Sequence, residues 1–216
     1  MMSDNADWKK YRSILCLNGK LPARTFFENL NLPVIAADGA ANTLHESGIK
    51  PSIIIGDLDS VHDYVRENNK VHHSPDQNFT DFHKSLQYMQ QNELLPAIIV
   101  GINGGYLDHI LNNVNIFLET DADCLLYDPP MFGCVLNHGA RKEWSLPLQT
   151  KISFIGIPSA TVTSRGLKWD LQQKKLQFPG MNSCFNRTAE QSISVEIHEG
   201  AVLVLIYMES IKDAGM

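Results

Sequence analysis

Two aspartates stand two residues apart after an apolar run, in the segment Gly56-Asp57-Leu58-Asp59-Ser60. In extended backbone such residues share a side, with Cα atoms roughly 6 to 7 Å apart. Mg²⁺ takes one or two carboxylates together with phosphate oxygens and waters, so this spacing indicates a bracket for a hard cation. The alternative is structural: Asp59 caps the next helix and Asp57 is solvated in a turn.

Acidic residues also follow three other segments that have the pattern of strands. They lie in Ala37-Asp38-Gly39-Ala40-Ala41-Asn42, in Ser74-Pro75-Asp76-Gln77-Asn78-Phe79-Thr80-Asp81 and in Gly104-Gly105-Tyr106-Leu107-Asp108-His109. In an open α/β sheet, ligands bind at the carboxyl ends of the strands, where these segments would converge. Four acidic strand ends at one edge favour the cation site over the structural alternative.

Weaker signals belong to the same edge. Gly104-Gly105, before a helix, and Asn18-Gly19, after the first strand, leave backbone N–H groups free to approach phosphate, although plain turns explain both. Thr80 resembles a helix N-cap, which would occupy its hydroxyl. Asp108 and Asn112 lie one helical turn apart and share a face, which points toward the site or toward water.

The elements that must position these residues alternate between strand and helix up to about residue 128. Strands are expected at Ser13–Leu17, Val34–Ala37, Ser52–Ile55, Val71–His73, Ala97–Gly101 and Cys124–Tyr127. Helices are expected at Ala23–Leu30, Ala40–Ser47, Val61–Asn68, Asp81–Gln91 and Leu107–Leu118. This alternation predicts a three-layer α/β domain with a mostly parallel sheet over residues 1–130.

After Asp128-Pro129-Pro130 the pattern changes to short alternating runs with no long amphipathic helix. Strands are expected at Phe132–Leu136, Lys151–Ile155, Ala160–Ser164, Ser192–Ile197 and Ala201–Tyr207. The pattern predicts a β-sandwich over residues 131–216. In this part Trp169, beside a charge, either stacks on a flat heterocycle or belongs to the core.

Composition excludes several classes of function. The chain has 216 residues, 44% of them apolar, and a formal net charge of −6, so it lacks the basic stripe of a nucleic-acid binder. No segment approaches the roughly 20 apolar residues that span a bilayer. Four widely spaced cysteines without a C-x-x-C pair indicate reduced thiols and a cytoplasmic protein.

Taken together, these motifs resemble the thiamine pyrophosphokinase family, in order over most of the chain. The matching segments are the four strand-end segments above, with Pro75-Asp76-Gln77 and Thr80-Asp81-Phe82 in the third, followed by Gly166-Leu167-Lys168-Trp169 and by Ser183 with Asn186. The resemblance implies a homodimer with sites between one subunit's α/β domain and the other's β-sandwich. It also implies transfer of pyrophosphate from ATP to the hydroxyl of thiamine, which yields thiamine diphosphate and AMP.

Residue roles follow from the resemblance and from the motifs. Magnesium is expected on Asp57, Asp59 and Asp81. The nucleotide is expected near Asn18, Asp38, Gly39, Asn42, Thr80, Gly104 and Gly105. Thiamine is expected near Gln77, Asp108, Trp169, Ser183 and Asn186, with Trp169 stacked on its ring. Asp81 or Asp108 would accept the hydroxyl proton.

Two positions depart from the family pattern. Tyr106 stands where an arginine is expected, and Phe185 replaces the second serine of a Ser-x-Ser-Asn motif. Two rival functions remain. The D-x-D strand end also resembles a haloacid-dehalogenase-type phosphatase, although no convincing later lysine and paired acids were found. The missing arginine would also suit a thiamine- or nucleotide-binding module with little catalysis.

Overall fold

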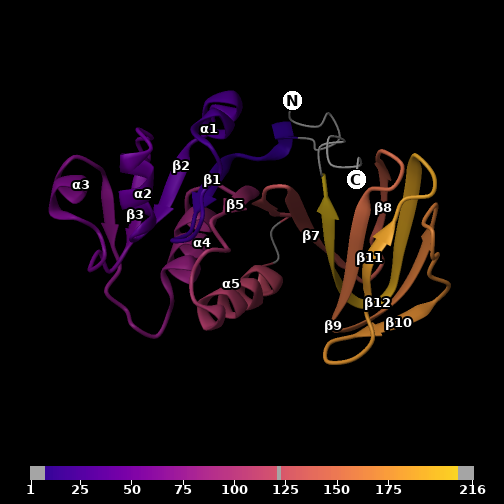
Figure 1. Ribbon diagram of the computed structural model, residues 1–216. Helices are drawn as coiled ribbons and strands as arrows, with labels where there is room; N and C mark the ends of the chain where they lie inside the picture. Colours follow the sequence, from indigo (N-terminus) through magenta and orange to yellow (C-terminus); the bar gives the residue numbers. More distant parts are fainter. Residues whose placement is uncertain (1–7, 121–122, 209–216) are drawn as a thin grey trace. The chain divides into compact units, whose positions relative to one another are not determined.

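The computed structural model describes residues 8–120 and 123–208 of the chain. They fall into two compact units, one comprising Trp8–Asp128 and the other containing residues 129–208. Figure 1 shows helices and strands in the first unit and strands in the second. No helix in the described ranges is long and apolar enough to cross a membrane.

The first unit is built on a parallel sheet in the order β6-β5-β1-β2-β3-β4. Its strands are β1 (Ser13–Cys16), β2 (Val34–Ala37), β3 (Ile53–Gly56), β4 (Val71–His73), β5 (Ala97–Val100) and β6 (Leu125–Asp128). The central strands β1, β2 and β5 are buried along their whole length, which explains their continuous apolar sequences. The chain runs outward from β1 to β4 and then returns to β5, so the direction of winding reverses between β1 and β5.

Helices connect these strands: α1 (Arg24–Leu30), α2 (Ala40–Glu46), α3 (Asp63–Glu67), α4 (Asp81–Gln91) and α5 (Leu107–Glu119), preceded by the short helix η1 (Trp8–Lys10). Figure 1 shows α1 on one side of the sheet and α4 and α5 on the other. The predicted three-layer α/β arrangement is therefore confirmed. The expected helix Val61–Asn68 is shorter, because the chain enters α3 only after His62.

Helix α4 shows how the sequence dictates its local structure. Thr80 is the N-cap, as predicted, and its hydroxyl accepts a hydrogen bond from the backbone N–H of His83. Phe82, Ser85 and Met89 repeat at helical spacing and are buried. This packing fixes the first turn of α4, and with it Asp81, against the sheet.

The second unit depends on two long antiparallel strands, β9 (Lys151–Arg165) and β12 (Ser192–Tyr207). One half of this pair is flanked by β7 (Met131–Asn137) on β12 and by β11 (Ser183–Arg187) on β9. The other half is flanked by β8 (Arg141–Ser145) on β12 and by β10 (Lys174–Gln177) on β9. Two four-stranded halves thus share β9 and β12, which is the predicted β-sandwich.

The sequence predicted four strands where the structure has these two. The expected breaks at residues 156–159 and 198–200 are instead places where the register shifts within the β9–β12 pair. Gly200 has φ +70°, and a Cβ there would lie 1.9 Å from the carbonyl oxygen of Ser159. Glycine thus permits a close backbone approach and leaves the strand continuous where its sequence resembles a turn.

Three strands, β8, β10 and β11, were missed. Each buries a single side chain: Trp144, Leu176 and Asn186, respectively. A strand whose other residues are exposed or half-buried has no apolar alternation in its sequence, so periodicity could not reveal it.

The importance of the close backbone approach at Gly200 can be tested by comparison with a second glycine, Gly139. Gly200→Ala is expected to lower the free energy of unfolding by more than about 2 kcal/mol, because backbone strain is added to a clash with Ser159. Gly139→Ala is the control, since Gly139 also has positive φ but open space around it, and should cost about 1 kcal/mol. Equal losses in denaturant unfolding would show that the close approach is unimportant.

Candidate active site

A cavity of about 600 Å³ opens in the first unit at the carboxyl ends of the strands. Its lining includes residues that follow β1, β2, β3 and β5, and it therefore lies where the winding of the sheet reverses, the usual ligand position in such folds. Predicted site residues in its lining are Asn18, Asp38, Gly39, Asp57, Gln77, Thr80, Asp81, Gly105 and Asp108. Asn42, Asp59 and Gly104 are not among the lining residues.

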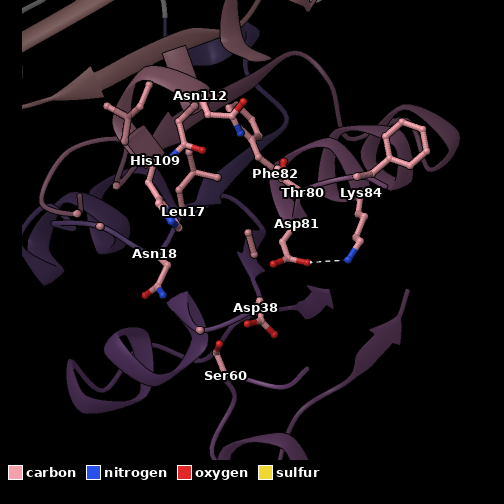
Figure 2. A pocket seen from close by; sticks show the side chains of 18 of the residues that line it. Leu17, Asn18, Asp38, Ser60, Thr80, Asp81, Phe82, Lys84, His109 and Asn112 are labelled. Atoms are coloured by element: carbon pink, nitrogen blue, oxygen red, sulfur yellow. Dashed lines mark hydrogen bonds and ion pairs between the residues drawn. The ribbon is translucent and has the colours of Figure 1, made fainter. Parts of the chain in front are cut away.

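Three carboxylates meet in this cavity. One oxygen from each of Asp38, Asp57 and Asp81 lies within 4.8 Å of the others. Asp38 follows β2, Asp57 follows β3 and Asp81 begins α4, so three separate elements bring them together. Figure 2 shows Asp38 and Asp81 near one another in the pocket.

Gly56, the last residue of β3, makes this approach possible. A Cβ at this position would lie 2.8 Å from Cβ of Asp38 and 3.0 Å from Oδ1 of Asp81. Any larger residue would therefore displace one of the two carboxylates. The backbone of Asp38 is also unusual, with φ +41°, a left-handed conformation that few residues other than glycine adopt and that is concentrated at functional sites.

The carboxylates differ in their electrostatic environment. Asp38 is 6% exposed, and its Oδ1 is buried without a hydrogen-bond partner. Burial, and secondarily the charge of Asp81, raises the pKa of Asp38. Asp57 accepts a hydrogen bond of 2.7 Å from the side-chain amide of Gln77, which is the main cause that lowers the pKa of Asp57.

These features fit a divalent cation. A buried, unpartnered carboxylate oxygen is costly unless a cation or donor completes it. Converging carboxylates also repel one another, and a hard cation with oxygen ligands relieves both costs. Asp38, Asp57 and Asp81 are the residues of the described chain that would hold such an ion.

Asp59 is placed differently from our expectation. Strand β3 ends at Gly56, and Leu58 has φ +67°, so the segment from Asp57 to Asp59 turns instead of remaining extended. The premise that the two aspartates share a side of a strand is therefore wrong. The Asp59 carboxylate accepts a hydrogen bond from the hydroxyl of Ser60. It does not cap α3, which begins four residues later.

Two other expected nucleotide residues, Asn42 and Gly104, make hydrogen bonds within the protein near the site. The Asn42 side chain donates to the carbonyl of Ser60 at 2.8 Å and accepts from the N–H of His62 at 3.0 Å, so it ties α2 to the loop after β3. The N–H of Gly104 donates to the side chain of Asn103 at 2.8 Å. Neither residue presents its polar group to the cavity in the way that the motifs suggested.

Lys84 is a residue of the cavity that the sequence motifs did not indicate. It lies one helical turn after Asp81 on α4, is 6% exposed, and its Nζ donates to Asp81 Oδ1 at 3.1 Å. Figure 2 shows this ion pair beside the cavity. The i,i+3 spacing of Asp81 and Lys84 was a signal that could have revealed the pair.

In the second unit, Trp169 is 57% exposed, with the ammonium of Lys168 4.6 Å from its ring centroid. Asn186 holds this segment: its Nδ2 donates to the Trp169 carbonyl at 2.8 Å, and its Oδ1 accepts from the Trp169 N–H at 3.2 Å. Asn186 is 2% exposed and also donates to Ser183 Oγ at 3.3 Å. The side-chain amide of Asn186 therefore already forms its hydrogen bonds within the protein.

The two departures from the family pattern lie at the surface. Tyr106 precedes α5 and is 82% exposed. Phe185 has φ +52°, is 58% exposed, and its ring packs near that of Tyr207.

Comparisons with known proteins match both units. The family model "Thiamin pyrophosphokinase, catalytic domain" matches residues 26–126, and "Thiamin pyrophosphokinase, vitamin B1 binding domain" matches residues 143–202. Thiamine pyrophosphokinase 3 of Oryza sativa subsp. japonica is 30% identical, over 89% of this chain and 85% of the relative. Thiamine pyrophosphokinase 2 of Arabidopsis thaliana is 29% identical, over 94% and 88%.

Solved structures support the fold. Yeast thiamin pyrophosphokinase superposes with a TM-score of 0.80 at 18% identity, covering 94% of this chain and 87% of the other. The Bacillus subtilis thiamine pyrophosphokinase gives 0.77 at 20% identity, covering 92% and 100%. Sequence and fold agree, and the chain belongs to the thiamine pyrophosphokinase family.

Proposed function

We propose that the chain is a magnesium-dependent enzyme that transfers the pyrophosphoryl group of ATP to the hydroxyl of thiamine, giving thiamine diphosphate and AMP. The observation that carries this proposal is the carboxylate cluster of Asp38, Asp57 and Asp81 in the cavity of the first unit. Family membership supplies the two substrates. The comparisons favour neither the phosphatase nor the weakly catalytic binding module.

The proposed magnesium ligands are Asp57 and Asp81, as the sequence predicted, together with Asp38. Asp59 is not part of the cluster, and its Oδ1 accepts a hydrogen bond from the hydroxyl of Ser60. When bound, the metal neutralises charge on the phosphate oxygens. The loops after β1 and β5, with Asn18 and Gly105 in the cavity lining, would then lie along the nucleotide.

The transfer requires a hydroxyl aligned with the β-phosphorus. The hydroxyl oxygen of thiamine attacks this phosphorus, and the bond to the oxygen shared with the α-phosphorus breaks, so AMP leaves with that oxygen. The hydroxyl proton passes to a carboxylate. Of the two candidates, Asp108 suits this role better, because Asp81 is already paired with Lys84 and belongs to the cluster.

The residues that we propose to bind thiamine are Gln77 and Asp108 in the first unit and Trp169 and Ser183 in the second. The exposed ring of Trp169 offers a flat surface for stacking on the thiamine ring. Ser183 would lie near the substrate. Asn186, predicted to bind thiamine, is assigned a positioning role, because its amide already holds both backbone groups of Trp169.

The proposal also covers the oligomeric state of the protein and its cellular location. We propose a homodimer, which exposed apolar side chains on both units support, among them Leu107 and Leu111 of α5 and Phe178. We also propose a cytoplasmic protein, because the sequence has no C-x-x-C pair and Cys16 and Cys124 are buried free thiols. The net charge of −6 supports the absence of a nucleic-acid partner.

A product assay tests the proposed reaction. Incubation with Mg²⁺, ATP and thiamine is expected to give thiamine diphosphate and AMP in equal amounts. ADP with thiamine monophosphate would point to a one-phosphate kinase, and binding of thiamine without turnover would favour the binding module. An aspartyl-phosphate trapped with hydroxylamine during turnover would favour the phosphatase.

Variants connect this activity to the cluster. Asp57→Asn or Asp81→Asn should reduce kcat by at least about 100-fold, because electrostatic stabilisation at the phosphate is lost. Asp63→Asn is the control: Asp63 is an exposed aspartate of the same unit, paired with Arg66. Asp59→Asn decides whether Asp59 joins the metal, since full activity of this variant would exclude it from the set.

The raised pKa of Asp38 predicts that the ionised carboxylate, the form that would bind a metal, destabilises the metal-free protein. When the pKa of a carboxyl is higher in the folded state than in the unfolded state, ionisation of that carboxyl destabilises the fold. The stability that the protonated carboxyl contributes is complete below the unfolded-state pKa and is lost as pH rises through the folded-state pKa. In metal-free buffer at pH 7, Asp38→Asn should therefore melt at a higher temperature than the wild type. Asparagine also tolerates φ +41°.

At pH values below the usual aspartate range this advantage should disappear, because Asp38 is then protonated. The variant should also gain less thermal stability from added Mg²⁺ than the wild type. A lower melting temperature of Asp38→Asn at pH 7 without metal would contradict the assignment of Asp38 as a destabilising, metal-dependent carboxylate.

The positioning role of Asn186 gives a prediction for thiamine. Asn186→Ala removes the partners of both Trp169 backbone groups and should raise the KM for thiamine about 10-fold, while the KM for ATP stays unchanged. Asn182→Ala is the control, since Asn182 makes similar bonds to Gly156 and Gln177. A change in tryptophan emission in the first variant only would support a displaced Trp169, and an unchanged KM for thiamine would refute the role.

A further inference from the structure

Lys84 is a buried cation in the wall of the candidate active site. Its side chain is 5% exposed, although lysine is rarely buried at all. Among the described residues that line the cavity, it is the one lysine or arginine. A positive charge at this position therefore needs an explanation beyond solubility.

The fold fixes this charge beside the carboxylate cluster. Lys84 lies on α4 between the buried Phe82 and Met89, so the helix cannot rotate to expose it. Its Nζ bonds to Asp81 Oδ1 at 3.1 Å. A buried ion pair recovers its desolvation cost only when its remaining donors and acceptors are satisfied. An ammonium group has three N–H donors, and the described chain gives Lys84 one acceptor, Asp81.

The charge balance of the loaded site indicates what completes Lys84. Asp38, Asp57 and Asp81 are already mutually close, and a polyphosphate would bring several further negative charges. A divalent cation bound to the three carboxylates neutralises only part of this negative charge. Among the residues named in the cavity lining, Lys84 supplies the fixed positive charge that remains.

A further observation supports an action of Lys84 beyond Asp81. The Oδ1 of Asp38 is buried without a hydrogen-bond partner, so the cluster is incomplete without a ligand.

We propose that Lys84 is a catalytic residue that donates a hydrogen bond to a phosphate oxygen of the pyrophosphoryl group while it remains paired with Asp81. This inference rests on the proposed function, because it names a residue that contacts the transferred group. Lys84 would hold that group against the metal and oppose the charge that develops on its oxygens.

Inorganic pyrophosphate is the probe for this contact. Its affinity for the full chain is measured by calorimetry at saturating Mg²⁺, for the wild type and for Lys84→Met, Lys84→Arg and Lys70→Met. Lys84→Met should bind pyrophosphate about 10- to 100-fold more weakly, the loss expected for a charge-assisted hydrogen bond. Lys84→Arg should recover part of this affinity. Lys70→Met, which removes an exposed lysine just before β4 and outside the cavity, should bind as the wild type does.

Saturating Mg²⁺ separates this role from a positioning role. If Lys84 only orients Asp81, its loss weakens Mg²⁺ binding, and the affinity for pyrophosphate recovers once the metal saturates. Recovery would overturn the proposal. Steady-state kinetics give a second readout: the KM for ATP should rise in Lys84→Met, while the KM for thiamine stays within about two-fold. If Lys84→Met does not fold, Lys84→Gln, which can still donate to Asp81, replaces it.

The two proposals can fail separately. If the wild type forms thiamine diphosphate and Lys84→Met binds pyrophosphate normally, the contact is refuted and the reaction stands. If the wild type forms no thiamine diphosphate but pyrophosphate binding depends on Lys84, the phosphate contact stands and the reaction is refuted.

Discussion

The convergence of three carboxylates around Gly56 is the constraint on which the rest of the first unit depends. Like charges within 4.8 Å repel one another, and one of the three, Asp38, is buried as well. Only a rigid framework can hold such groups together, and the parallel sheet with α4 packed against it provides that framework. The site is therefore preorganised at a cost in stability, which a cation would recover.

The electrostatic cost of the cluster also explains the polar residues around it. Gln77 donates to Asp57, Ser60 donates to Asp59, and Lys84 pairs with Asp81, so each of these aspartates has a distinct partner. Asp38 is the exception, with one oxygen left unpartnered. A cluster with one buried carboxylate oxygen left unpartnered is suited to a ligand that supplies positive charge, and a divalent cation that enters with a polyphosphate supplies it.

Much of this could be predicted from the sequence. Apolar strands followed by acidic turns gave the α/β fold and brought Asp38, Asp57 and Asp81 to one edge, because parallel strands place their carboxyl ends together. The sequence-based predictions were wrong in detail where the backbone departs from regular helix or strand geometry. The left-handed Leu58 turns Asp59 away from the extended geometry that its spacing implied. Gly200 keeps β12 continuous where its sequence resembles a turn, and the buried amide of Asn186 depends on contacts that only the folded chain creates.

Anomalous diffraction from crystals soaked with Mn²⁺ and a non-hydrolysable ATP analogue would locate a metal in the carboxylate cluster. We expect a peak about 2.0 to 2.3 Å from carboxylate oxygens of Asp38, Asp57 and Asp81, with phosphate oxygens completing the coordination. A peak elsewhere in the cavity, bound by neither Asp38 nor Asp81, would contradict this expectation, as would well-ordered nucleotide with no metal at the cluster.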